Sequence, residues 1–267
     1  EDWNQTFGDS LDDGGEFVQQ TSDGGFIIAG WTYSFSNGES DSWLIKTNSN
    51  GGEEWNQNFG GGNTDVGLSV NQLNDGGYIV TGYTESLGSD AKDVWLYKTD
   101  IQGNALIIEL FGGSSDEIGN SVRQTDDGGY IVTGYTESFG NGGNDIWLIK
   151  TDSDCNQEWS RTFGGSNNDF GKSVRQTNDG GYIVAGWTNS SGSGNYDSWL
   201  IKTNSNGNEE WSQTFGGTDI DVGESVRQTD DGGYIVTGWT NSSGSGNYDS
   251  WLIKTDPDGN AGSSVQY

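Results

Sequence analysis

Two sets of carboxylates recur along this chain at intervals of 52 residues. Carboxylate oxygens are ligands that hard cations prefer, and they accept hydrogen bonds from sugar hydroxyls, so each set is a candidate for binding Ca²⁺ or a hydroxylated ligand. The structural alternative is that they cap loops through local backbone hydrogen bonds or pair with recurring Lys or Arg. The first set, which supplies the candidate metal ligands, is Asp13, Asp65, Glu117, Asp169 and Asp221, and the second is Asp41, Asp93, Asp145, Asp197 and Asp249.

Aromatic residues recur at the same interval and are candidates for stacking on sugar rings. Aromatic side chains carry a large apolar face, so packing in the interior is the structural alternative. Two tyrosines occur in the loops of only two copies, where we expect better exposure. The candidate ligand-binding residues are Trp31, Tyr83, Tyr135, Trp187, Trp239, Tyr196 and Tyr248.

Catalysis is disfavoured by the residue types that the chain lacks. There is no His and only one Cys, Cys155, so the usual general base, zinc ligand and cysteine–histidine pair are missing. Paired carboxylates could hydrolyse glycosides, but we expect the loops of such enzymes to differ between copies, and residues 189–203 and 241–255 are identical. The chain is therefore predicted not to be an enzyme, with a glycoside hydrolase as a remote alternative. No cofactor is expected, and Ca²⁺ is the one candidate.

The charge of the chain narrows the choice of partner. There are 40 acidic and 11 basic residues, which gives a net charge of −29. Nucleic acid is excluded because phosphate binding needs basic patches, and no apolar run is long enough for insertion into a membrane. Eight basic residues fall at two repeat positions and are predicted to pair internally, although the arginines lie on a strand that could line a channel: Lys46, Lys98, Lys150, Lys202, Lys254, Arg123, Arg175 and Arg227.

The elements that position these residues belong to a 52-residue unit present five times without insertion or deletion. Such a period indicates stacked or circular repeats. In the third unit, alternating and β-branched runs predict strands over 119–125, 129–136, 145–151 and 158–163, with a D-G-G hairpin turn between the first two. A glycine inside each second strand predicts close backbone approach, as at Gly30, Gly82, Gly134, Gly186 and Gly238.

Both ends of the chain could supply the fourth strand of the fifth unit. The fifth unit ends after its third strand, and residues 1–8 match the fourth strand of the other units. We predict that residues 1–8 form the outer strand of the fifth unit and so remove a sheet edge. The tail, residues 261–267, fits the same register less well. The chain is then predicted to form one domain over residues 1–260, followed by the tail.

The strings S-V-R-Q-T-x-D-G-G-Y-I-V-x-G-x-T and D-x-W-L-I-K-T-D-x-x-G-N resemble a β-propeller repeat of secreted and surface proteins in bacteria and archaea. The blade count resembles the five-bladed tachylectin-type lectins. The resemblance implies an all-β, five-bladed propeller with four antiparallel strands in each blade. It also implies an extracellular or cell-surface location.

A non-catalytic, multivalent binding module follows from the repeated polar and aromatic loops, because weak sites gain avidity when they are multiplied. Glycans or cell-surface proteins are the predicted partners. The alternative is a structural subunit or cap of a surface layer or filament that self-assembles through its termini.

Overall fold

The computed structural model describes residues 3–89 and 91–262, and within them the secondary structure is entirely β. No helix that could cross a membrane occurs in this part of the chain. The strands are β1 (Asp13–Gln20), β2 (Phe26–Thr32), β3 (Asp41–Thr47), β4 (Glu53–Phe59), β5 (Asp65–Gln72), β6 (Tyr78–Thr84), β7 (Asp93–Thr99), β8 (Ala105–Phe111), β9 (Glu117–Gln124), β10 (Tyr130–Thr136), β11 (Asp145–Thr151), β12 (Gln157–Phe163), β13 (Asp169–Gln176), β14 (Tyr182–Thr188), β15 (Asp197–Thr203), β16 (Glu209–Phe215), β17 (Asp221–Gln228), β18 (Tyr234–Thr240) and β19 (Asp249–Thr255).

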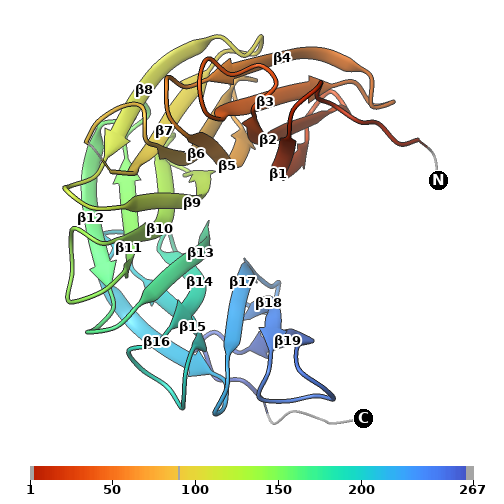
Figure 1. Ribbon diagram of the computed structural model, residues 1–267. Helices are drawn as coiled ribbons and strands as arrows, with labels where there is room; N and C mark the ends of the chain where they lie inside the picture. Colours follow the sequence, from red (N-terminus) through yellow and green to blue (C-terminus); the bar gives the residue numbers. More distant parts are fainter. Residues whose placement is uncertain (1–2, 90, 263–267) are drawn as a thin grey trace. The chain divides into compact units, whose positions relative to one another are not determined.

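The strands form five sheets in which sequence neighbours pair (Figure 1). Four sheets have four strands, β1–β4, β5–β8, β9–β12 and β13–β16, and the fifth has three, β17–β19. One sheet for each 52-residue unit confirms the predicted all-β class and the five-bladed propeller. The chain divides into two compact units, one of Glu1–Gln124, Gly128–Tyr130 and Asp152–Asn156, the other of Thr125–Asp127, Ile131–Thr151 and Gln157–Tyr267. These are called the first and second compact units below.

The D-G-G turns close the first hairpin of each sheet as predicted. In the first sheet, Asp23 accepts hydrogen bonds from the Thr21 hydroxyl and from the Gly25 backbone N–H. Gly24 has a φ of 85°, a left-handed conformation that glycine adopts without steric cost. A glutamine of the following sheet then caps the turn, since the Ser22 N–H donates to Gln72 Oε1 at 2.7 Å. The Asp126 N–H donates to Gln176 Oε1 in the same way, at 2.8 Å.

A glycine inside the second strand lets two backbones meet. The register between β5 and β6 shifts between Gly67 and Ser69, so β5 carries a bulge, and Gly82 lies beside it. A β-carbon on Gly82 would overlap the Val66 carbonyl oxygen. The equivalent glycines, Gly30, Gly186 and Gly238, face the same backbone oxygen in their own sheets, which confirms the predicted close approach.

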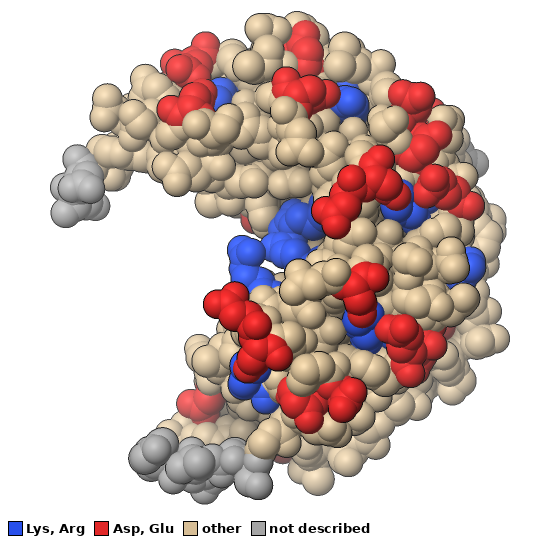
Figure 2. Space-filling model, turned by 180° about the vertical axis from the view of Figure 1, so that it is seen from behind, with Lys and Arg blue, Asp and Glu red and all other residues tan. Residues whose placement is uncertain are grey.

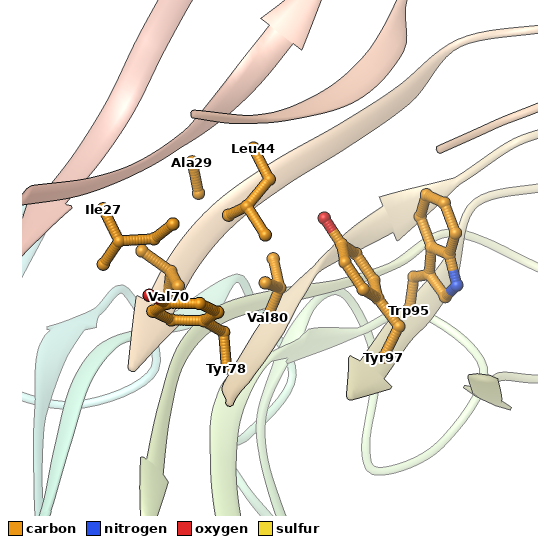
Figure 3. Packing of buried hydrophobic residues seen from close by; sticks show 8 residues of the cluster. All are labelled: Ile27, Ala29, Leu44, Val70, Tyr78, Val80, Trp95 and Tyr97. Carbon is orange, nitrogen blue, oxygen red and sulfur yellow. The ribbon is translucent and has the colours of Figure 1, made fainter. Parts of the chain in front are cut away.

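Apolar side chains from neighbouring sheets pack face to face. In the first compact unit, Ile27, Ala29 and Leu44 of the first sheet contact the second sheet at Val70, Tyr78, Val80, Trp95 and Tyr97 (Figure 3). All eight are essentially inaccessible to solvent. Fully burying a side chain of this size contributes about 1.5–3 kcal/mol, so contacts between sheets hold each compact unit together.

The recurring lysines are paired, as the sequence predicted. Lys202 is buried between two carboxylates, at 2.9 Å from Asp179 and 2.8 Å from Glu210. Lys46 and Lys150 have the same two partners in their own sheets. Several of the basic side chains seen in Figure 2 lie directly beside acidic ones. The recurring arginines differ: in the described part of the chain, no ion pair joins Arg123, Arg175 or Arg227 to a carboxylate. Two of them have internal partners of another kind, because Arg123 donates to the Val122 carbonyl oxygen at 2.5 Å and Arg175 donates to the Val174 carbonyl oxygen at 3.2 Å.

The predicted strand over residues 1–8 is not formed in its described part, where residues 3–8 have no regular structure. These residues nevertheless contact the first sheet in the way that β4, the outer strand of the first sheet, contacts the second sheet. The Trp3 and Phe26 rings meet edge to face at 5.8 Å, as do Trp55 and Tyr78 at 5.7 Å. In the fifth sheet, Ala261 pairs with Thr255 at the position where a fourth strand would begin, and residues 263–267 lie outside the described part of the chain. Closure by residues 1–8 stays a prediction.

A cavity of about 450 Å³ lies on the first sheet beside residues 3–7. Its lining includes Val18, Phe26, Ile28, Trp43 and Ile45. These residues are the 52-residue equivalents of Val70, Tyr78, Val80, Trp95 and Tyr97, which pack against the first sheet. The cavity is therefore a sheet-packing face, and its shape gives no reason to assign it a ligand.

Candidate functional site

The first carboxylate set ties the loops at one end of each sheet together. Asp169 is buried and accepts hydrogen bonds from the Gly165 N–H at 3.0 Å and from the Ser190 hydroxyl at 2.6 Å. It thus joins the loop before β13 to the loop after β14. The same loops also bond directly, because Asn167 donates from its backbone N–H to the Ser190 hydroxyl and from its amide to the Asn189 carbonyl oxygen. Asp65 and Asp221 make the same pair of bonds, Asp13 accepts the Ser34 hydroxyl, and Glu117 accepts the Gly113 N–H.

The second carboxylate set lies beside the first, across a glycine. A β-carbon on Gly164 would touch both Asp145 Oδ1 and Asp169 Oδ2, so the two buried carboxylates leave room only for the glycine. Gly60 lies in the same way between Asp41 and Asp65. Burial and then the neighbouring Asp169 carboxylate raise the pKa of Asp145, while a hydrogen bond from the Asn141 backbone opposes the increase. The pKa of Asp197 is raised for the same reasons, by burial and then by Asp221.

These shifts predict a maximum of stability near the ordinary carboxyl pKa of 3.8. Because the pKa of Asp145 is raised in the folded protein, this group stabilises the fold when it is protonated. Its contribution is fully present below the ordinary pKa of 3.8 and is lost as pH rises through the raised pKa. Asp179 acts in the opposite direction. Its burial favours the neutral form, but hydrogen bonds from Thr177 and Lys202 lower its pKa to about 2, so that stability is present above 3.8 and lost as pH falls.

Urea unfolding between about pH 2 and about pH 8 tests this prediction. Replacement of Asp145 with asparagine, which imitates the protonated acid, should flatten the loss of stability above the maximum. The exposed Asp219→Asn variant is the control and should keep the slope of the unaltered protein. An Asp145→Asn variant with an unchanged slope would contradict the assignment.

The carboxylates do not gather into a metal centre. Within the described ranges, no group of three or more His, Cys, Asp or Glu is placed to hold a metal ion. In the first set, Asp13, Asp65, Asp169 and Asp221 each accept two or more loop hydrogen bonds. In Asp65 and Asp169 both bonds go to Oδ2, and Oδ1 is buried without a hydrogen-bond partner among the described residues. This arrangement favours loop capping, the structural alternative, for that set. Calcium binding stays a prediction that rests on residue type alone.

Aromatic side chains form a continuous row in the second compact unit. The Tyr135 and Phe170 rings are 4.8 Å apart, Phe170 and Trp187 are 4.0 Å apart, and Trp187 and Tyr196 meet edge to face at 4.5 Å. All four are partly exposed. The row joins the end of β10, the start of β13, the end of β14 and the loop after β14. The structure therefore brings three of the predicted ligand-binding residues together around Phe170.

A second aromatic pair repeats one end of this row. Trp239 meets Tyr248 edge to face at 4.9 Å, and Tyr248 is 63% exposed. The loops that carry Tyr196 and Tyr248 are identical in sequence. The second compact unit thus presents two copies of a Trp–Tyr corner, each bordered by Asn, Ser and Gly.

In the first compact unit, the equivalent aromatic residues have polar partners. Trp31 donates its ring N–H to Glu16 Oε1 at 3.1 Å and meets Tyr33 edge to face. Tyr83 lies under the Lys92 ammonium, 4.9 Å from its ring centre. The predicted residues at this repeat position therefore do not form five equal sites.

Sequence analysis missed Phe170 and Lys92, which complete these clusters. Phe170 stands directly opposite Trp187 in the β13–β14 register. That register was readable from the D-G-G hairpin, since counting outward from the turn pairs these positions. Lys92 has no equivalent in other repeats and gave no periodic signal.

Cys155 offers no nucleophile, because burial raises the pKa of its thiol to about 12.

Five antiparallel sheets, one for each repeat, with functional candidates on the loops at their ends, define the chain as a β-propeller. No protein-family model matches the sequence, and comparison with curated proteins finds no match. Solved structures do match. A protein of unknown function from Bacteroides caccae has a TM-score of 0.59 at 14% identity, with 92% of this chain and 79% of that chain covered. The WD40 domain of Neurospora crassa Pan2 has a TM-score of 0.51 at 9% identity, with 91% and 75% covered.

A further match corrects one prediction. A protein described as a candidate gluconolactonase has a TM-score of 0.50 at 13% identity, with 94% of this chain and 78% of that chain covered. The prediction that the chain is not an enzyme therefore does not hold, because a similar propeller is described as a candidate enzyme and this fold excludes no catalysis. At this identity the likeness shows the fold alone and assigns no reaction to the chain.

Proposed function

We propose that the chain is a multivalent glycan-binding module that acts outside the cell or at its surface. The observation that carries the proposal is the pair of identical Trp–Tyr corners, Trp187–Tyr196 and Trp239–Tyr248, in the second compact unit. In each, one aromatic face is partly exposed beside a loop of hydrogen-bonding side chains. A sugar ring needs both features, an apolar surface for its C–H face and polar groups for its hydroxyls.

The resemblance to secreted propeller repeats and to five-bladed lectins supports the same proposal. Two equal corners in one chain raise affinity for a polymer that carries repeated sugars, because the second binding event becomes intramolecular. Nothing in this arrangement depends on calcium.

A glycan array, probed at high protein density once with calcium and once with chelator, tests the proposal. We expect a signal on neutral or acidic oligosaccharides in both conditions. The Tyr196→Ala/Tyr248→Ala variant should bind its best glycan about tenfold more weakly, since each aromatic face contributes about 0.5–1.5 kcal/mol. Phe35→Ala, which removes an exposed aromatic ring from a first-sheet loop, is the control. Silence across the array, or equal binding by the Tyr196→Ala/Tyr248→Ala variant, would refute the proposal.

A further inference from the structure

Arg175 and Arg227 occupy the same place on adjoining strands of the second compact unit. They lie on β13 and β17, the first strands of the fourth and fifth sheets (Figure 1). The two strands touch at the residues just before the arginines, because the Val226 N–H donates to the Ser173 hydroxyl at 3.3 Å. The two guanidinium groups are therefore neighbours.

These cations have no carboxylate partner. Over residues 3–89 and 91–262, the ion pairs involve lysines alone, and none includes Arg175, Arg227 or Lys172 of β13. Arg175 donates to the Val174 carbonyl oxygen at 3.2 Å. A guanidinium has five N–H donors, so most of them are left for another acceptor. In a chain with 40 acidic residues, two adjoining unpaired arginines are unexpected.

The repeat shows that the fold does not need a cation at this position. The 52-residue equivalents in the first two sheets are Gln19 and Asn71, and there the Asn71 amide donates to Gln19 Oε1 at 3.3 Å. A neutral pair thus bridges the strands where the second compact unit has two like charges. Burial and then the charge of Arg227 lower the pKa of Arg175 to about 10, which shows that the arrangement costs free energy when nothing neutralises it.

We propose that Arg175 and Arg227 together bind an oxyanion group, a carboxylate, sulfate or phosphate, of a small ligand. Guanidinium groups present N–H donors in a planar fork that matches the oxygens of such groups, and an anion between two of them removes their mutual repulsion. The net charge of −29 does not prevent binding, because distant carboxylates are screened beyond about 8 Å at physiological salt. Strand β17 carries two acidic residues: Asp221, which is buried, and Glu224, which is exposed to solvent.

The other repeats of the chain supply the residue types for a test variant that should fold normally. Arg175→Gln with Arg227→Asn installs the residue types that the first two sheets carry at this position, so the fold should be kept. Arg161→Gln removes a charge from β12, where the guanidinium lies over the Trp159 ring, and serves as the control. Thermal unfolding of each variant confirms that it is folded.

Isothermal titration calorimetry with sodium sulfate, sodium phosphate, an oligogalacturonic acid and a neutral oligosaccharide of equal length is the test. We expect oxyanion binding that weakens as salt rises, that falls at least about tenfold in the Arg175→Gln/Arg227→Asn variant and that is unchanged in Arg161→Gln. Binding of the inorganic ions would identify a free oxyanion as the ligand, and binding of the acidic sugar alone would identify an acidic glycan. Absence of binding by every anion, or equal weakening in Arg161→Gln, would overturn the proposal.

This inference does not depend on the glycan-binding proposal. The Tyr196→Ala/Tyr248→Ala variant should retain oxyanion binding while it loses neutral sugars. The two proposals can therefore fail separately.

Discussion

Replacement of Gly82 with alanine should destabilise the protein severely. A β-carbon at this position would overlap the Val66 carbonyl oxygen, and backbone beside a bulge cannot move aside as a side chain can. We expect a loss of about 3 kcal/mol or more in the free energy of unfolding, at the upper end of what one added carbon costs in a packed interior. Thermal unfolding followed by circular dichroism should show a fall in Tm of about 10 °C.

Gly62→Ala is the matched control for Gly82→Ala. Gly62 is exposed, has no heavy atom within 4 Å of the added carbon and does not adopt a left-handed conformation. Its substitution should change the free energy of unfolding by no more than about 0.5 kcal/mol. Equal Tm values for the two variants would show that β5 and β6 do not approach as closely as described.

Ile107→Trp should be destabilising alone and harmless together with Cys155→Gly. In four repeats, the turn between the third and fourth strand positions holds a glycine whose added β-carbon would lie 2.5–2.7 Å from the ring of the tryptophan 48 residues earlier in the chain. These pairs are Gly51 with Trp3, Gly103 with Trp55, Gly207 with Trp159, and Gly259 with Trp211. The remaining repeat has Cys155 in the turn and Ile107 in place of the tryptophan. We infer that the smaller, ring-free side chain leaves room for the thiol.

A double-mutant cycle measures this coupling. Ile107→Trp alone should cost about 2–3 kcal/mol by overpacking against the buried Cys155. Cys155→Gly alone removes a buried side chain but relieves a left-handed φ of 65°, so a net change of about 1 kcal/mol or less is expected. The double variant should match the unaltered protein, which makes the coupling about 2 kcal/mol or more. Additive effects would show that the two positions do not touch.

The fold was predictable because one 52-residue pattern repeats without a gap. Strand boundaries in the third unit agree with the structure to within two residues, and the turn glycines and the buried lysines follow from their recurrence. The strand over residues 1–8 could not be settled in this way. The sequence match between residues 1–8 and the fourth strands agrees with the contact of Trp3 with the first sheet. The match does not show which sheet edge would supply hydrogen bonds to residues 1–8.

The candidate site was less predictable, because it depends on how repeats differ. Trp187 and Trp239 were found from periodicity, whereas Phe170, which joins Tyr135 to Trp187, stands where Val66 and Val222 stand in other sheets. The arginines show that recurrence alone does not identify the kind of partner. Recurrence suggested internal pairing for Lys202 and Arg175 alike, yet the lysine has two carboxylates beside it and the arginine has another arginine.

The glutamines that cap the D-G-G turns give the chain a direction of assembly. The Ser22 N–H donates to Gln72, and the Asn178 N–H to Gln228, so the turns of the first four sheets are completed by the sheet that follows in the sequence. During synthesis, a turn that has already emerged from the ribosome must wait for the next 52 residues before this hydrogen bond can form. In the first four repeats, the turn therefore gains this hydrogen bond only after the following repeat has been synthesised.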